Sequence, residues 1–326
     1  MERYNMLQDE GIRRFVLESE SLRPAYAAGA AIAEQRIFYD RLCRHFRRPR
    51  PIGIEVQDLF VNGPDASVSI RLYRPMTIGS LPALLYLHGG GYMLGGLDSH
   101  DDICAEIADR AGVAVIAIAY RLAPEDLFPA AFEDCRAVRD WVACSGAEHG
   151  IRSDTIAIAG DSAGGGLAAA LALDARDRGA PRISGQILVY PDLGGDTSKG
   201  SYVEHAQAPG LTTDDVRCYR SAYLGSSVDP ALGSKFAHPL RESSFDGVAP
   251  AFLVAAEWDP LRDDCFEYAG RLQACGVPVT VRHEPLLVHA FLRARHMSKP
   301  AAESFTAIAA AVRSLAYKKE LPLQAA

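Results

Sequence analysis

A serine in a five-residue turn carries the clearest chemical signal in the sequence. Ser162 lies in G-D-S-A-G at 160–164, between an apolar run at 155–159 and a run rich in alanine and leucine at 165–175. A G-x-S-x-G turn between a strand and a helix strains the backbone and holds the serine hydroxyl clear of the sheet. The helix N-terminus behind it favours a developing negative charge. Small residues at a tight turn can be purely structural, but this context favours a nucleophile.

A glycine-rich segment earlier in the chain could stabilise the oxyanion that an attacking serine creates. His88 is followed by three glycines at 89–91, directly after an apolar run. HGGG is a known oxyanion-hole sequence in lipases and esterases, where backbone N–H groups bind the oxyanion. We expect Gly89 and Gly90 to supply two donors, Ala163 to supply a third, and His88 to brace the loop. A phosphate-binding loop is the alternative, but the lysine of G-x-x-x-x-G-K-[ST] is missing.

A histidine late in the chain is the best candidate for the base that the serine needs. Where a serine acts from a strand–turn–helix elbow, the chain order is serine, then an acid, then a histidine. His289 lies in a short loop after a strand-like run at 279–283, and a side chain there can reach back to the serine. His283 lies inside that run and is expected at the surface. His289 would accept the serine proton and later donate it to the leaving group.

The acid that orients this histidine is expected just past a late strand. The apolar run at 251–255 predicts the strand, and Asp259 follows it, directly before Pro260 and therefore on a loop. Asp259 would fix the tautomer of His289. Three nearby acidic residues are weaker alternatives: Glu257, Asp263 and Asp264.

These residues need a rigid scaffold, and the apolar pattern predicts an α/β sheet. Strands that are buried on both faces of a parallel sheet are almost continuously apolar, and five segments have this pattern: 83–87, 113–119, 155–159, 186–190 and 251–255. Helical stretches alternate with them, which predicts right-handed βαβ crossovers; they lie at 133–144, 164–178 and 265–275. Earlier in the chain, alternating runs at 54–61 and 67–73 predict a β-hairpin.

Two segments stand outside this alternation. Residues 1–50 look helical and end in a cluster of arginines, which could bind an anion but is more typical of a solvated helix end; they are Arg44, Arg47, Arg48 and Arg50. Residues 192–235 have no strand pattern and contain a helical stretch at 214–223. An insertion of that length between strands is usually functional.

Composition and charge argue against several classes of protein. The chain has 326 residues, of which 48% are hydrophobic and 23% charged, an ordinary globular balance. A formal net charge of −7 gives no reason to expect a nucleic acid or an anionic membrane as partner. No apolar run approaches the ~20 residues that span a bilayer. Seven scattered cysteines and the lack of a signal-like segment favour a cytoplasmic protein. Without an H-E-x-x-H or clustered Cys/His pattern, we expect no metal and no cofactor.

Taken together, the motifs resemble the hormone-sensitive-lipase-like family of bacterial esterases. The matching segments, in the order of the family, are HGGGY at 88–92, YRLAPE at 120–125, FPAA at 128–131, GDSAGG at 160–165, DPLRD at 259–263 and HAF at 289–291. The resemblance implies an α/β-hydrolase fold with an eight-stranded, mostly parallel sheet, and hydrolysis of short-chain acyl esters. It implies Ser162 as nucleophile, Asp259 as acid and His289 as base.

The resemblance also implies a division of the chain into a catalytic domain and a helical cap. The cap would consist of the N-terminal helices at 1–50 and the insertion at 192–235, and the catalytic domain of 51–191 and 236–326. Arg121 and Glu125 would brace the oxyanion loop. Aromatic residues of the cap could line the substrate pocket, although each is individually more typical of packing: Tyr26, Phe38, Tyr39, Tyr202 and Tyr223. Members of the family often form dimers, so a homodimer is an expectation.

The sequence departs from the family pattern in three places. Leu286 and Ala290 stand where the family usually has glycine, and Ala119 replaces a common aspartate. Leu286 and Ala290 could reshape the pocket near His289. Amide hydrolysis or acyl transfer would use the same triad, so the sequence discriminates poorly among these reactions. A ligand receptor on the same fold is a third hypothesis, but such receptors lose the histidine, and this chain retains it.

Overall fold

One mixed sheet forms the centre of the molecule. The computed structural model describes the chain except for residues 1–3, 5, 23–30, 78, 226–233 and 319–326. Eight strands lie in the order β1-β2-β4-β3-β5-β6-β7-β8. Their bounds are β1 Ile54–Asn62, β2 Ser67–Pro75, β3 Leu81–Leu87, β4 Ala114–Ala119, β5 Ile151–Asp161, β6 Ile183–Val189, β7 Ala251–Trp258 and β8 Val279–Val288.

Antiparallel and parallel pairing divide the sheet as the sequence predicts. β1 and β2 form the expected hairpin, and β2 also pairs antiparallel with β4. All other neighbouring strands are parallel. Parallel strands end at one edge of the sheet, so the loops that follow β3, β5, β7 and β8 gather there. This edge is where the candidate chemical groups were predicted.

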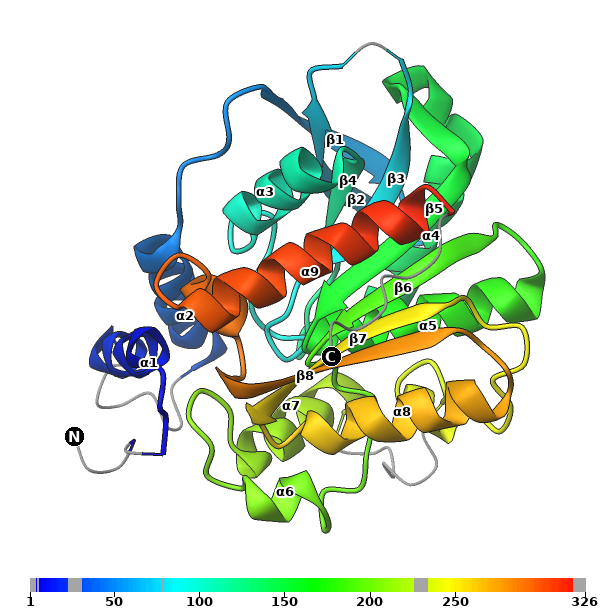
Figure 1. The fold of residues 1–326 in the computed structure, drawn as a ribbon. Coiled ribbons are helices and arrows are strands. Elements are labelled where there is room, and N and C mark those ends of the chain that lie inside the picture. Colours follow the sequence, from blue (N-terminus) through cyan, green and yellow to red (C-terminus); the bar gives the residue numbers. More distant parts are fainter. Residues whose placement is uncertain (1–3, 5, 23–30, 78, 226–233, 319–326) are drawn as a thin grey trace.

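Helices cover both faces of the sheet (Figure 1). α3 (Asp101–Ala111) and α9 (Lys299–Ala316) pack on one face, and α4 (Ala130–Ser145), α5 (Ala163–Arg178) and α8 (Arg262–Ala274) pack on the other. Each face has its own hydrophobic core, because side chains alternate between the two sides of every strand. On β3, for example, Leu84 belongs to one core and Leu85 to the other.

In the described part of the chain, four further helices lie outside the layers that cover the sheet. α1 (Glu10–Leu22) and α2 (Ile32–Phe46) come from the N-terminal segment, and α6 (Ser201–Glu204) and α7 (Thr213–Leu224) from the insertion after β6. A capping box fixes the start of α7, where Thr212 and Asp215 satisfy each other's backbone N–H groups. Short 3-10 helices also occur among the described residues, at η2 Gly146–His149, η4 Pro239–Arg241 and η5 Phe291–Ala294.

The arginine cluster at the end of α2 pairs with the protein's own carboxylates. Arg50 forms a two-point bond to Asp101, with distances of 2.9 and 2.7 Å. Arg47 lies 3.6 Å from Asp98, and the backbone N–H of Arg48 donates to Asp102. All four arginines of the cluster are exposed, as predicted for a solvated helix end, and these contacts also tie the end of α2 to the start of α3.

Candidate active site

Ser162 lies on a strained turn between β5 and α5. Its φ of 54° is a left-handed conformation that a residue with a side chain adopts at a cost of ~1–3 kcal/mol, and such strain clusters at functional sites. A Cβ added to Gly164 would lie 2.0 Å from the carbonyl oxygen of Leu87, so only glycine permits this approach of α5 to β3. The Ser162 N–H donates to Val189 O at 3.0 Å, which ties the turn to the end of β6.

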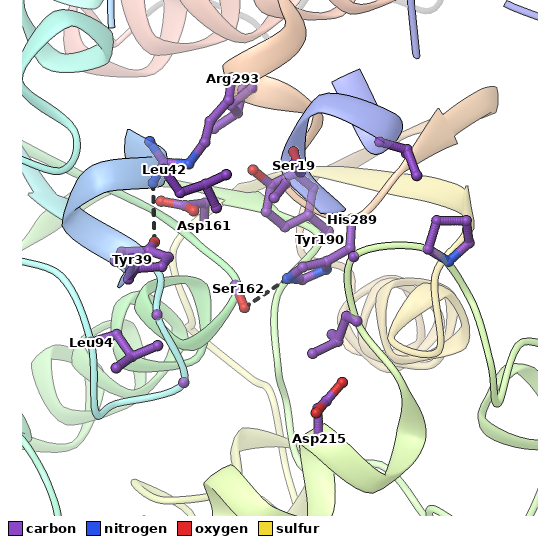
Figure 2. Close-up of a pocket in the computed structure, with 18 of the residues that line it drawn as sticks. Ser19, Tyr39, Leu42, Leu94, Asp161, Ser162, Tyr190, Asp215, His289 and Arg293 are labelled. Carbon is purple, nitrogen blue, oxygen red and sulfur yellow. Dashed lines mark hydrogen bonds between the residues drawn. The ribbon is translucent and has the colours of Figure 1, made fainter. Parts of the chain in front are cut away.

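The three residues predicted to act together form one hydrogen-bonded chain. Ser162 Oγ lies 3.0 Å from His289 Nε2 (Figure 2). His289 Nδ1 lies 2.7 Å from Asp259 Oδ2. An ionised carboxylate only accepts hydrogen bonds, so the Nδ1 proton of His289 faces Asp259 and Nε2 is left to accept from the serine. Asp259 is fully buried, and its Oδ1 accepts the N–H of Leu261. Asp259 follows β7 directly and His289 follows β8 directly.

The three weaker candidates for the acid are engaged elsewhere. Glu257 bonds to His283 and to Arg262, Asp263 accepts the N–H of Ser201, and Asp264 accepts the N–H of Leu193. His283 is half exposed on β8, as predicted for a surface residue.

The loop that follows β3, which we name the glycine loop (residues 88–94), differs from the prediction at Gly89. The N–H of Gly89 donates to Asp161 Oδ1 at 3.1 Å, so it is not free to bind an oxyanion, and the prediction for this donor is wrong. Gly90 and Gly91 line the pocket that contains Ser162, whereas Gly89 does not. Gly90 has a φ of 132°, and a Cβ there would lie 2.2 Å from Leu94 O. Ala163, the third predicted donor, is the first residue of α5.

His88 holds the glycine loop through its ring and its backbone carbonyl. Burial, reinforced by the nearby His100, lowers its pKa to about 4, so the imidazole is neutral at pH 7. Its Nδ1 lies 2.9 Å from Gly89 O, an acceptor, which places the proton on Nδ1. Tyr120 stacks on the His88 ring, with centroids 4.3 Å apart, and donates its hydroxyl to His88 O. The loop-bracing role expected of His88 agrees with these contacts.

Asp161, next to the serine, is a buried carboxylate that the sequence analysis did not single out. Burial alone would raise its pKa, but His100, Arg293 and the Tyr86 hydroxyl outweigh burial and lower the pKa to about 2. Tyr86 donates to Asp161 Oδ1 at 2.9 Å, and His100 Nε2 lies 3.3 Å from Oδ2. Asp161 therefore stays ionised and holds the first peptide of the glycine loop.

Replacing Asp161 with asparagine should remove a stability contribution that depends on pH. The folded-state pKa of about 2 lies below the usual 3.8, so ionised Asp161 stabilises the fold above pH 4, and this contribution disappears as the pH falls through about 2. We expect Asp161→Asn to lower the free energy of unfolding by about 2 kcal/mol at pH 7. Urea titrations at pH 7 and at pH 3 should show the difference shrinking at the lower pH. An equal difference at both pH values would contradict the assigned charge.

The pocket above Ser162 has a volume of about 270 Å³ and is lined by both N-terminal helices and by the insertion. Phe38 and Tyr39 line it, as the sequence suggested. Tyr202 and Tyr223 do not; Tyr223 stacks on Tyr92 of the glycine loop. Tyr26 lies outside the described residues.

Only one of the two departures near His289 reaches the pocket. Ala290 lines the pocket and has a left-handed φ of 63°, the conformation for which glycine is favoured. Leu286 lies within β8 and is not among the lining residues. The strand continues to Val288, two residues beyond Leu286, so the effect of this leucine falls on the strand and not on the pocket.

Arg121 and Glu125 were both expected to brace the glycine loop, but only Glu125 is linked to it in the contacts described below. Arg121 bonds to Asp134 of α4 and to Asp65, and so acts away from the glycine loop. Glu125 pairs with Arg36 of α2, which in turn donates to the backbone of Met93 in the glycine loop. Arg36 was missed by the sequence analysis, because a helix pattern shows which face is polar and not which group that face will meet.

Within the described part of the chain, one group of side chains has the spacing of a metal site. It consists of Glu204, His205 and Glu257, whose ligand atoms lie within 4.8 Å of one another. The guanidinium of Arg262 already satisfies all three, with distances of 2.6 to 2.9 Å. A bound cation would have to displace this arginine, so the cluster is better described as an ion-pair network.

Comparison with known proteins agrees with the predicted fold and with ester hydrolysis. Residues 84–293 match the model of a family described as having the alpha/beta hydrolase fold. The chain is 40% identical to Esterase LipI of Mycobacterium tuberculosis in an alignment of 249 residues, which span 76% of this chain and 78% of LipI. It is 35% identical over 265 residues to an ethyl acetate hydrolase of Pseudomonas putida, which covers 79% of this chain and 82% of that protein.

A solved structure extends the similarity to almost the whole chain. A hyperthermophilic esterase from the archaeon Pyrobaculum calidifontis aligns with a TM-score of 0.86 and 32% identity, over 93% of this chain and 97% of that one. None of the helices in the described residues has the length and apolarity that crossing a bilayer requires. The chain belongs to the hormone-sensitive-lipase-like family of α/β hydrolases and is a carboxylic ester hydrolase.

Proposed function

We propose that the protein hydrolyses short-chain acyl esters through an acyl-enzyme, with Ser162 as nucleophile, His289 as general base and acid, and Asp259 as the orienting acid. The observation that carries the proposal is the hydrogen-bonded chain from Ser162 Oγ through His289 to Asp259, with distances of 3.0 and 2.7 Å. Nucleophile, base and orienting acid within hydrogen-bond reach are the signature of this chemistry.

In the acylation step, His289 Nε2 takes the hydroxyl proton of Ser162 as Oγ attacks the ester carbonyl. The tetrahedral oxyanion would be bound by the N–H groups of Gly90, Gly91 and Ala163. Gly91 replaces Gly89 in this set, because the Gly89 N–H is donated to Asp161. When the carbonyl re-forms, His289 returns the proton to the leaving alkoxide, and the alcohol departs.

In the deacylation step, the same groups act on water. His289 takes a proton from a water molecule, whose oxygen attacks the acyl carbon, and then protonates Ser162 Oγ as it leaves. The carboxylic acid and the free serine are regenerated. Asp259 keeps the imidazole in the productive tautomer and stabilises the imidazolium in both steps.

A fluorophosphonate probe tests the proposed nucleophile directly. Phosphonylation should be stoichiometric, and mass spectrometry should place the adduct on the peptide that contains Ser162. Native protein that resists the probe, or carries the adduct on another serine, would contradict the proposal. Native protein that resists the probe would also favour the ligand-receptor hypothesis.

Short acyl chains are favoured by the size of the pocket. Its volume of about 270 Å³ is small for a ligand site, since such sites run from ~300 to ~1,000 Å³. The similarity to a protein named ethyl acetate hydrolase points the same way. We expect kcat/KM for p-nitrophenyl esters to be highest between acetyl and hexanoyl and to decline towards dodecanoyl. A maximum at dodecanoyl would indicate a lipase instead.

Two other reactions could use the same groups, and matched substrates separate them. An amidase would turn over an anilide at a rate comparable to that of the ester with the same acyl group. An acyltransferase would give an ester product when a second alcohol competes with water. We propose hydrolysis of esters because relatives named as esterases are similar to this chain along most of its length.

We also propose that residues 1–50 and 192–235 act as a cap over the catalytic domain formed by 51–191 and 236–326. The support is that α1, α2 and α7 contribute lining residues to the pocket above Ser162. A cytoplasmic location fits the scattered, unpaired cysteines.

A further inference from the structure

Helix α2 of the proposed cap makes direct contacts with the glycine loop. Arg36 and Tyr39 are three residues apart and so share one face of α2. Arg36 Nε donates to Met93 O at 2.9 Å, and the Tyr39 hydroxyl lies 3.4 Å from Gly89 O. These two carbonyls lie on either side of Gly90 and Gly91, so α2 holds the loop both before and after the glycines.

The contact at Gly89 O sets the direction of the next N–H group. The carbonyl of Gly89 and the N–H of Gly90 belong to one planar trans peptide, in which the two groups point in opposite directions. Fixing the carbonyl oxygen therefore fixes the line along which the Gly90 N–H points. His88 Nδ1 donates to the same oxygen at 2.9 Å, and Tyr39 adds a second donor from the cap.

The direction of the Tyr39 bond follows from its other partner. Arg293, four residues after His289, donates from Nη2 to the Tyr39 oxygen at 3.0 Å (Figure 2). A guanidinium has donors only, so the hydroxyl proton of Tyr39 is left for Gly89 O. Tyr39 thus connects the loop that carries His289 with the peptide that presents the Gly90 N–H.

Arg36 connects the glycine loop to a second loop. Its Nη2 donates to Ala123 O at 3.1 Å, and the guanidinium also forms a two-point ion pair with Glu125, at 2.8 and 2.6 Å. The side chain of Glu125 is 53% exposed, and exposed ion pairs contribute little to folding stability. Loss of Arg36 should therefore affect the loop more than the fold.

Helix α7 encloses the glycine loop from another side. A Cβ on Gly91 would lie 2.4 Å from the ring of Tyr219, so this ring rests directly on the glycine backbone. Tyr223 stacks on Tyr92, with ring centroids 3.9 Å apart and planes 6° apart. The loop is held between two helices that come from different parts of the chain.

From these contacts we propose that Arg36 and Tyr39 are positioning residues, through which helix α2 aligns the backbone donors of the oxyanion hole. The inference rests on the proposed role of Gly90 and Gly91. It assigns α2 a part in transition-state stabilisation, beyond covering the pocket. Their removal should therefore weaken binding of the oxyanion more than binding of the substrate, because only the transition state carries the full charge.

The test compares Arg36→Met and Tyr39→Phe with two control variants. Arg41→Met changes an exposed arginine of the same helix, whose bond is to Leu22 O. Tyr317→Phe removes a hydroxyl that donates to Gly112 O, at the far end of α9. Steady-state rates with p-nitrophenyl acetate would be measured together with inhibition by a trifluoromethyl ketone, which mimics the tetrahedral oxyanion.

We expect kcat to fall about tenfold for Arg36→Met and about threefold for Tyr39→Phe, with KM changed less than kcat. Affinity for the trifluoromethyl ketone should fall by the same factor as kcat/KM. Arg36→Lys, which keeps a cationic donor group but not the planar fork of the guanidinium, should recover part of the rate. Both control variants should match the native protein.

Three results would overturn the inference: native kcat in both α2 variants, a rise in KM alone, or an equal loss in the controls. If Arg36→Met fails to fold, as judged by circular dichroism, Tyr39→Phe decides the question. Failure of the proposed function is distinguishable, because it would appear as native protein that the fluorophosphonate does not label. Native labelling together with unaffected α2 variants would remove only the positioning role.

Discussion

Replacing Ser162 with alanine is expected to lower kcat for a short acyl ester by about a millionfold, because no other group can form the acyl-enzyme. Alanine preserves the volume of the turn and removes only the hydroxyl that bonds to His289. The left-handed φ of 54° is equally strained in both proteins, so the melting temperature should change little. A residual rate about 10³-fold above that in water would remain from the oxyanion hole and substrate binding.

A matched serine and a chemical probe make this result decisive. Ser198 is exposed in the insertion, where its hydroxyl bonds to Asp196, and Ser198→Ala should keep full activity. Fluorophosphonate labelling should disappear in Ser162→Ala and persist in Ser198→Ala. If freshly purified Ser162→Ala, free of contaminating native enzyme, kept even a hundredth of the native rate, another nucleophile would have to be sought.

Replacing Asp259 with asparagine is expected to lower kcat by about 10⁴-fold at neutral pH. The carboxylate is fully buried and accepts the Nδ1 proton of His289 at 2.7 Å. An amide at this position can turn its NH₂ group towards the ring, which would move the histidine proton to Nε2. His289 would then present a donor to Ser162, where an acceptor is needed. The measurement is kcat at pH 7, with folding checked by circular dichroism.

Glu257 provides the control for this prediction. It lies two residues before Asp259, bonds to His283 and Arg262, and was an alternative for the orienting acid in the sequence. Glu257→Gln should leave kcat near the native value. A larger loss in Glu257→Gln than in Asp259→Asn would reverse the assignment of the acid.

The positions of the candidate triad could be predicted because each residue follows a recognisable strand. Apolar runs predicted β5 and β7, and a strand-like run at 279–283 predicted β8; parallel strands deliver the residues after them to one edge of the sheet. Ser162, Asp259 and His289 occupy those places, and their hydrogen bonds need only the reach of a side chain.

The choice of glycine donors could not be predicted in the same way. The glycine loop has no periodic pattern of apolar residues, so the sequence does not indicate which of its backbone N–H groups points towards Ser162. The deciding contact is the carboxylate of Asp161, which comes from a segment 72 residues away and takes the Gly89 N–H. Leu286 was misjudged for a related reason: β8 runs to Val288, so this leucine belongs to the strand and not to the loop near His289.

The contacts of α2 were also beyond the reach of the sequence. Arg36 is one of several charged residues on a helix whose apolar pattern predicts only a buried and an exposed face. Its partners at Met93 and Ala123 lie 57 and 87 residues away. Such contacts depend on how the helix docks, and a periodic pattern holds no information about docking.

The pocket draws on segments far apart in the chain, since its lining begins at Tyr4 and ends at Arg293. β8, which places His289, is also the last strand to be made and lies at the edge of the sheet. On the ribosome, the serine turn is therefore synthesised well before the histidine that is proposed to activate it. A nascent chain cannot form the proposed triad before β8 and His289 have been added, so hydrolytic activity is expected to appear only after this segment has left the ribosome.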